Sequence, residues 1–229
     1  MDKKEGYVIF TPIINTISIV IGSLIGIFIK KGVPKNIQNI LFYAVGLSTI
    51  GLSLTMILKT NNFLIVLSSL AIGGIIGELI NIEGKLKKIG DTIKEGDFST
   101  GFVTSSLLFL VGPLTIIGSI TAGLTNDGSL IYMKSLLDGI SSIVLSSIYG
   151  LGVLLSGFSV LVIQGLLVIF SSKLSFLTTP AYLNDLIAAG GVMVLGIGLK
   201  ILEIKDTRVG NFLPALLICP LLVFLVNLF

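Results

Sequence analysis

The sequence predicts an all-α integral membrane protein with about eight transmembrane helices, and three observations support this. Of the 229 residues, 53% are hydrophobic and 12% are charged, whereas soluble domains carry about 25% charged residues. The mean hydropathy is +1.06, and apolar runs of roughly 18 residues recur, each long enough to cross a bilayer as a helix. The alternating pattern of a β-barrel strand is missing, so helices are expected to satisfy the backbone.

We expect one transmembrane domain, 1–229, whose first unit (7–80) holds helices over 7–29, 37–58 and 63–80. Gly22 and Gly26 share one face of the first helix, where close packing inside the monomer is favoured over a dimer face. Asn62 stands where a side-chain cap would begin the third helix.

Residues 81–97 follow and form the most charged part of the chain. Apolar residues recur there at helical spacing with lysine and acidic residues between them. This pattern predicts an amphipathic helix that lies along the lipid headgroups on the cytoplasmic side.

The central pair of helices, within 98–157, has more hydroxyl residues and more breaks than the rest. Its apolar segments are 102–124, interrupted at Gly112-Pro113, and 136–156. A shift of 38 residues places Gly112 on Gly150 and Thr104 on Ser142. Gly157 is expected to form the turn into the last unit, 158–229, with helices over 158–170, 185–202 and 211–228.

The first and last units resemble each other in sequence. Ala44, Gly46 and Gly51 match Ala189, Gly191 and Gly196 at a constant offset of 145. The two units are five spans apart, an odd number, so they would have opposite orientations in the membrane. Inverted repeats of this kind around interrupted helices are typical of secondary transporters.

The distribution of basic residues predicts the orientation. With eight spans, one side receives five of the fifteen Lys and Arg residues, Lys134 among them, and the other side receives ten. Because basic residues favour the cytoplasm, both termini are expected to be extracytoplasmic.

Asp138 is the first candidate for a functional residue, since a carboxylate in an apolar segment marks an ion or proton path by default. The alternative is an ion pair with Lys134, four residues earlier, close to the membrane surface. Hydroxyl groups and a helix break could complete a site for a Na⁺-like ion or a polar solute, unless they serve helix packing; these candidates are Thr104, Ser105, Ser106, Gly112, Pro113, Ser141, Ser142 and Ser146.

Four amides are further candidates. Asn15 and Gln164 are single amides in apolar helices, where they either bind a ligand or join helices. Asn62 and Asn211 are related by the repeat and either cap helices or attract anions at the helix ends.

Composition argues against several function classes. The chain has no His and a single Cys, Cys219, so we expect no internal disulfide, no Cys/His metal site and no His-dependent catalysis. Its lysines form no stripe with aromatic residues, so no nucleic-acid binding is expected. No phosphate-binding loop is present, and we expect neither an enzyme nor a cofactor.

Three stretches resemble a known family: GFVTSSLLFLVGPLTIIGSI, KSLLDGISSIVLSSIYGLGV and RVGNFLPALLICPLL. They are similar to the YdfK/YqgA family of bacterial and archaeal inner-membrane proteins, a resemblance that covers nearly the whole chain. The resemblance implies a polytopic plasma-membrane protein and no settled activity.

The residues themselves therefore carry the functional hypothesis. They favour a secondary transporter for a small solute or ion, coupled to an ion or to protons. A channel-like pore and a membrane scaffold that transports nothing are the alternatives. The expected partners are membrane lipid, the transported solute and a second copy of the chain in a homodimer.

Overall fold

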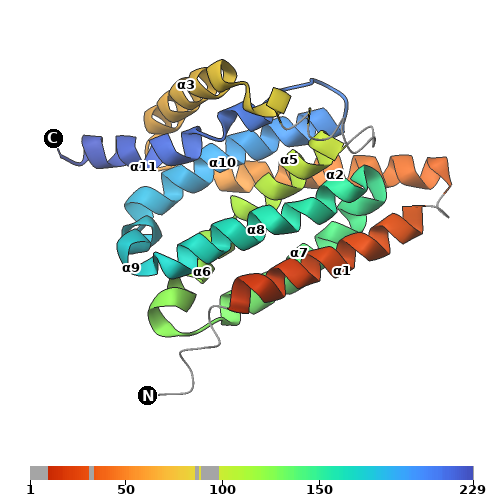
Figure 1. Cartoon of the computed structure of the whole chain (residues 1–229). Coiled ribbons are helices and arrows are strands. Elements are labelled where there is room, and N and C mark those ends of the chain that lie inside the picture. Colours follow the sequence, from red (N-terminus) through yellow and green to blue (C-terminus); the bar gives the residue numbers. More distant parts are fainter. Residues whose placement is uncertain (1–9, 31–33, 86–87, 89–97, 229) are drawn as a thin grey trace.

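The computed structural model describes residues 10–30, 34–85, 88 and 98–228, and within these ranges the fold is helical with no strand. The all-α prediction is confirmed (Figure 1). The helices in order are α1 (Thr11–Lys30), α2 (Lys35–Ile57), α3 (Phe63–Ile80), α5 (Phe98–Leu110), α6 (Pro113–Thr125), α7 (Ser129–Tyr149), α8 (Leu151–Ile169), α9 (Ser171–Leu174), η2 (Ser175–Thr178), α10 (Pro180–Ile201), η3 (Val209–Phe212) and α11 (Ala215–Val226).

Six stretches of the described chain are long and apolar enough to cross a membrane, and the bent α5–α6 pair makes up to seven. The predicted count of eight also includes α2, whose apolar part, Tyr43–Ile57, is shorter than the rest. Of the amphipathic helix expected over 81–97, residues 82–85 are helical, and most of the remainder falls outside the described residues.

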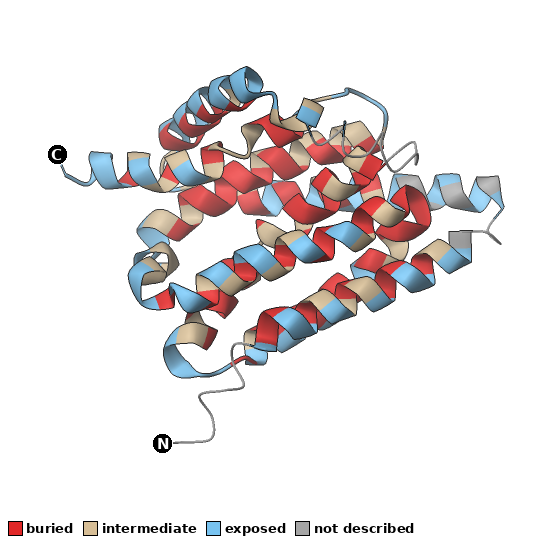
Figure 2. Ribbon diagram, viewed as in Figure 1, coloured by how far each residue is buried: buried red, intermediate tan, exposed pale blue. Residues whose placement is uncertain are grey.

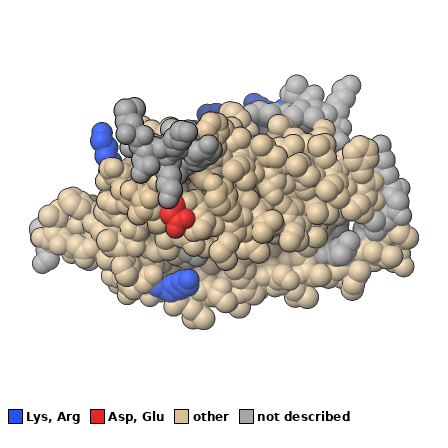
Figure 3. Space-filling view, turned by 90° about the horizontal axis from the view of Figure 1, so that it is seen from below, with Lys and Arg blue, Asp and Glu red and all other residues tan. Residues whose placement is uncertain are grey.

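The outward surface of the bundle is apolar, as a lipid-facing surface requires. Leu58, Leu79 and Leu217 are among the most exposed large side chains, and buried residues gather on the inner helix faces (Figure 2). The face in Figure 3 shows very few charged residues among those described. The described helices therefore match the bilayer on the outside and one another on the inside.

The helices form two groups, which we name by their members. The first group contains α1, α5, α6, α7 and α8; the second contains α2, α3, α10 and α11. Figure 1 shows α1 and α7 side by side at the bottom and α3 with α11 at the top. The closest packing is within each group, and α2 meets α7, and α10 meets α5, over shorter stretches.

Small residues bring α1 and α7 together in parallel. A Cβ atom on Gly22 would lie 2.2 Å from the carbonyl oxygen of Gly139, and one on Gly26 would lie 2.1 Å from that of Ile143. The Ser18 hydroxyl donates to the carbonyl of Ser135 at 2.6 Å. The predicted use of this glycine face inside the monomer is confirmed.

The turn between the fifth and sixth predicted helices lies at Gly150, so the expectation of a turn at Gly157 was wrong. Gly150 has a φ of 67°, a conformation that residues with a Cβ rarely adopt. Gly157 lies inside α8, where its carbonyl accepts a hydrogen bond from Thr16 at 3.2 Å. Gly150 is thus needed for the turn, whereas Gly157 is a packing position against α1, where a Cβ would lie 3.5–3.6 Å from side chains of that helix.

Polar side chains fix the turns at the two ends of the second group. The buried carboxylate of Asp185 accepts from the Thr60 hydroxyl and from the backbone amides of Asn61 and Asn62 at 2.7–3.0 Å. Asn62 caps α3 by accepting from the amide of Leu64, as predicted.

Asn211 does not act as the corresponding cap for α11, which was the other half of that prediction. Its oxygen accepts from the Glu83 amide at 2.8 Å, and its nitrogen donates to Glu78. Asn211 lies within the 3₁₀ turn Val209–Phe212, before α11 begins at Ala215, and it ties this turn to the end of α3.

Candidate functional site

The helix over 98–125 is broken where the sequence predicts, at Gly112-Pro113. The α5 and α6 segments meet at an angle of 55°. Proline has no N–H group to continue the helix, and the Thr115 hydroxyl instead donates to the carbonyl of Phe109 at 2.7 Å. The carbonyl of Phe109 therefore keeps a hydrogen-bond donor at the break, and the break lies beside α7.

A cavity of about 710 Å³ lies at this break. Its walls come from α2, α5, α6 and α7, so it lies between the two groups. Most of the lining is apolar, and the polar side chains on it are Ser48, Thr49, Lys134, Asp138 and Ser141.

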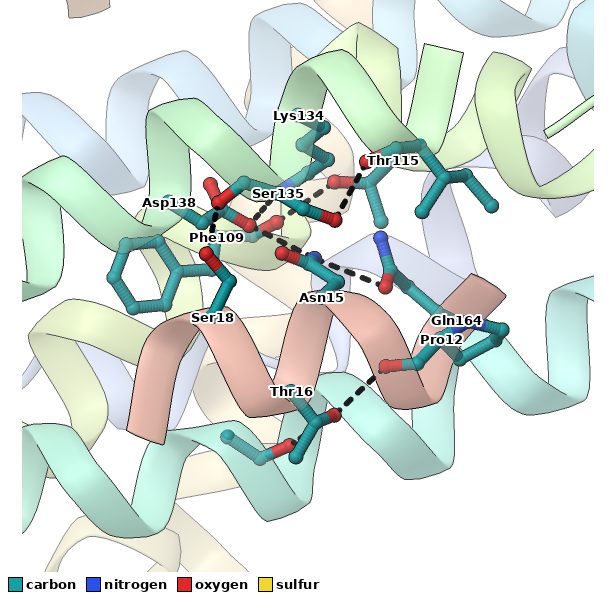
Figure 4. Close-up of polar contacts among 12 residues, drawn as sticks. Pro12, Asn15, Thr16, Ser18, Phe109, Thr115, Lys134, Ser135, Asp138 and Gln164 are labelled. Carbon is teal, nitrogen blue, oxygen red and sulfur yellow. Dashed lines mark hydrogen bonds and ion pairs between the residues drawn. The ribbon is translucent and has the colours of Figure 1, made fainter. Parts of the chain in front are cut away.

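Lys134 and Asp138 form an ion pair on α7 (Figure 4). Their side chains are only 5% and 9% exposed. Asp138 is the tenth of 21 residues in α7, which places it about 14 Å from the start of the helix at ~1.5 Å per residue. The pairing in the predicted alternative is present, and the pair is buried inside the bundle.

The Asp138 carboxylate is also held from α1, by an amide that is itself linked to α8. Asn15 donates to Oδ2 of Asp138 at 3.0 Å and to Oε1 of Gln164 at 3.1 Å. Both amide side chains are fully buried, and Asn15 Oδ1 and Gln164 Nε2 have no hydrogen-bond partner among the described residues. Asn15 and Gln164 thus join Asp138 in one polar cluster that spans three helices.

Lys134 also lies 5.9 Å from the centre of the Phe109 ring, at the end of α5. An aromatic ring face attracts an ammonium group at this distance. The lysine therefore connects the charged cluster on α7 to the helix break, and a movement of α5 would alter its surroundings.

The remaining predicted residues divide between the cavity and the helix interfaces. Gly112 and Ser141 line the cavity together with Asp138, and Pro113 begins α6. Ser142 and Ser146 instead face Gly22 and Gly26 of α1, and their hydroxyls donate to carbonyls within their own helix.

Thr104, Ser105 and Ser106 are buried in α5 and are not part of the cavity lining. The Ser105 hydroxyl donates to the carbonyl of Gly101 at 2.6 Å. These three residues and Ser142 therefore do not meet around Asp138, contrary to the predicted site. Asn62 and Asn211 serve the turns at the ends of the second group.

Two contributions to the cavity were missed by the sequence analysis. Lys134 was considered only as a surface partner of Asp138, although the four-residue spacing signalled the contact. Ser48 and Thr49 of α2 also line the cavity. The sequence signal for them was two adjacent hydroxyl residues within an apolar helix.

Apolar helices around a mostly apolar cavity with a buried ion pair in its wall define a polytopic α-helical membrane protein. The chain belongs to the family described as "Protein of unknown function (DUF554)", which matches residues 10–224. This confirms the family that the sequence motifs resemble.

Two relatives cover nearly the full chain. It is 34% identical over 224 residues to "Uncharacterized membrane protein YdfK" of Bacillus subtilis (strain 168), with 96% of this chain and 98% of the relative covered. It is 27% identical over 221 residues to "Uncharacterized protein YqgA" of Escherichia coli (strain K12), with coverage of 90% and 93%. No solved structure matches.

Proposed function

We propose that this protein is a secondary transporter that moves a small solute or ion across the plasma membrane, coupled to an ion or to protons. The observation that carries the proposal is the cavity at the α5–α6 break, with the buried Lys134–Asp138 pair in its wall. Ionisable residues inside a membrane bundle mark transport paths by default. Broken helices near mid-span are the usual place for such sites.

The helix pairing supports an inverted repeat. The three helices of the first predicted unit pack against their counterparts in the last: α1 against α8, α2 against α10 and α3 against α11. The second and third pairs run antiparallel: Gly46 of α2 lies by Leu202 and Ile50 by Gly198, while Gly73 of α3 lies by Ala215 and Gly77 by Asn211. Counterparts that face each other in opposite directions are what a two-fold axis in the membrane plane would produce.

The position of the cavity supports a mechanism. The second group lines the cavity through α2, and the first group lines it through α5, α6 and α7. A displacement of one group against the other would change access to the cavity without rebuilding either group. Alternating access by rocking of packed units follows this scheme.

Reconstitution tests the proposal. Purified protein in liposomes that contain a pH- or ion-sensitive dye would be challenged with pools of amino acids, organic acids and metal ions. A transporter gives a flux that saturates with solute and depends on an ion gradient. A current that needs no coupled solute would instead identify a channel. A flux no greater than that of empty liposomes under every gradient would favour a membrane scaffold that transports nothing.

We also propose extracytoplasmic termini and a homodimer. Because Lys134 is buried, it no longer counts among the basic residues exposed on the less basic side. The difference in basic residues between the two sides is then larger, and the more basic side is favoured more strongly as the cytoplasmic one. Because Gly22 and Gly26 pack on α7, a dimer face would lie elsewhere. A C-terminal reporter that is active on only one side of the membrane tests the orientation, and the mass of the purified protein in nanodiscs tests the dimer.

A further inference from the structure

We propose that the cavity binds a small zwitterion with a bulky apolar group, that is, an α-amino acid such as phenylalanine or leucine. Lys134 would pair with the ligand carboxylate, and Asp138 with its ammonium group. The assignment rests on the proposed function, because it names the solute class that the same cavity would carry.

The charge balance of the cavity favours a zwitterion. Lys134 and Asp138 neutralise each other, and both are more than nine-tenths buried. A lone cation or anion would pair with one of them and leave the other as an uncompensated buried charge, which is strongly unfavourable. A ligand with both charges at one end supplies a partner to each, so no buried charge is stranded.

The surroundings of the pair allow such an exchange. Asn15 donates to Asp138 from α1, and Gln164 accepts from the same amide, so the carboxylate stays oriented when the ammonium group of Lys134 leaves. Lysine has a flexible stem that can follow a new partner. Gly112 and Leu114, at the start of α6, line the same cavity, and the first turn of a helix favours a carboxylate.

The rest of the cavity suits an apolar group. Three large side chains at its rim, Leu52, Leu137 and Ile140, are 50%, 55% and 63% exposed, so the rim faces the bilayer while the charged pair is buried. The volume of about 710 Å³ falls within the range of roughly 300–1,000 Å³ for small-molecule pockets. A single dehydrated metal ion would leave most of this space unfilled.

A ligand series on the wild-type protein tests the assignment. Thermal stabilisation and isothermal titration in nanodiscs would compare L-phenylalanine and L-leucine with 3-phenylpropionate, 2-phenylethylamine and glycine. Each of the last three lacks one feature: the ammonium group, the carboxylate or the apolar side chain. We expect L-phenylalanine to bind at least tenfold more tightly than each of the three.

Two outcomes of this series would overturn the assignment. One is equal affinity for L-phenylalanine and for either singly charged analogue, which would mean that Lys134 and Asp138 do not recognise both charges of the ligand. The other is no binding of L-phenylalanine or L-leucine.

A double variant tests the role of the pair. Lys134→Met with Asp138→Asn removes both charges together, and we expect at least a tenfold loss of L-phenylalanine affinity. The matched control is Lys200→Met with Glu83→Gln, which removes an ion pair whose side chains are 21% and 16% exposed and which is not part of the cavity lining. Unchanged affinity in the first variant would overturn the assignment, whereas the control should bind as the wild type does.

Uptake of labelled L-phenylalanine into proteoliposomes separates the two proposals. Binding without uptake under any ion gradient would keep the zwitterion site and overturn the transporter. Coupled uptake of some other solute, with no amino-acid binding, would overturn the zwitterion site and leave the transporter standing.

Discussion

Loss of one member of the buried Lys134–Asp138 pair should destabilise the protein far more than loss of both. Asp138→Asn leaves the ammonium group without a countercharge, and Lys134→Met leaves the carboxylate with Asn15 as its remaining partner. Breaking a buried pair in this way costs about 3–5 kcal/mol in the free energy of unfolding.

The double variant should regain most of this loss. An amide at position 138 still offers an oxygen to Asn15, and methionine follows the path of the lysine stem. Since replacement of a whole buried pair is often neutral, we expect it to lie within about 1 kcal/mol of wild type. The coupling energy between the two positions is then about 5 kcal/mol or more, against roughly 0–1 kcal/mol for a surface pair.

The protein contains its own reporter for this measurement. Cys219 is the only cysteine in the sequence and is 0% exposed, so a thiol-reactive fluorophore labels it when the bundle unfolds. Denaturant titrations in mixed micelles, followed by this labelling, give the four free energies of the cycle. A coupling energy below about 1 kcal/mol would show that water reaches the pair, and the reasoning from burial would fail.

Other substitutions test the packing. Gly22→Ala would place a Cβ 2.2 Å from an α7 carbonyl oxygen and should cost about 1–3 kcal/mol in unfolding free energy. The control Gly51→Ala, with no atom within 4 Å of the new Cβ, should be neutral or stabilise by up to about 1 kcal/mol. Equal effects of the two variants in the Cys219 assay would contradict this packing. Asp185→Ala removes the acceptor of three hydrogen-bond donors in the α2–α3 turn and should lower the free energy of unfolding by about 3 kcal/mol or more. Asp206→Ala, at a side chain 83% exposed, should cost less than about 1 kcal/mol, and the reverse order would refute the role of Asp185. Gly150→Ala forces a Cβ into a φ of 67° and should cost about 1–3 kcal/mol; wild-type stability would show that the α7–α8 turn lies elsewhere.

The membrane class and the helix break were predictable because each follows from a local property. Hydropathy along a segment decides whether it can face lipid. Proline at position 113 has no N–H group, so a break there follows from covalent structure. Asn62 likewise caps α3 through a contact two residues away.

The turn between α7 and α8 could not be predicted, because Gly150 and Gly157 look alike in the sequence. Only the backbone angle at Gly150 and the contact of Gly157 with α1 distinguish a turn from a packing site. Both depend on where neighbouring helices lie.

The serines of α7 show the same limit for the site. A serine in a helix can donate to a carbonyl three or four residues back, so it needs no partner on another helix. Ser141 lines the cavity and Ser142 faces α1, although they are adjacent in the sequence. Lys134 was expected at the membrane edge because hydropathy treats any lysine as exposed.

The pairing of distant helices has a consequence for how the chain is made. The main partners of α1, α2 and α3 are α7, α10 and α11, and each is synthesised about a hundred residues or more after the helix it joins. Since domains are completed from the N-terminus during synthesis, the first three helices enter the bilayer before any of these partners exists. The small-residue face of α1 then meets lipid or an assisting protein until α7 is inserted, and a chain that stops before α10 leaves α2 and α3 without their main partners.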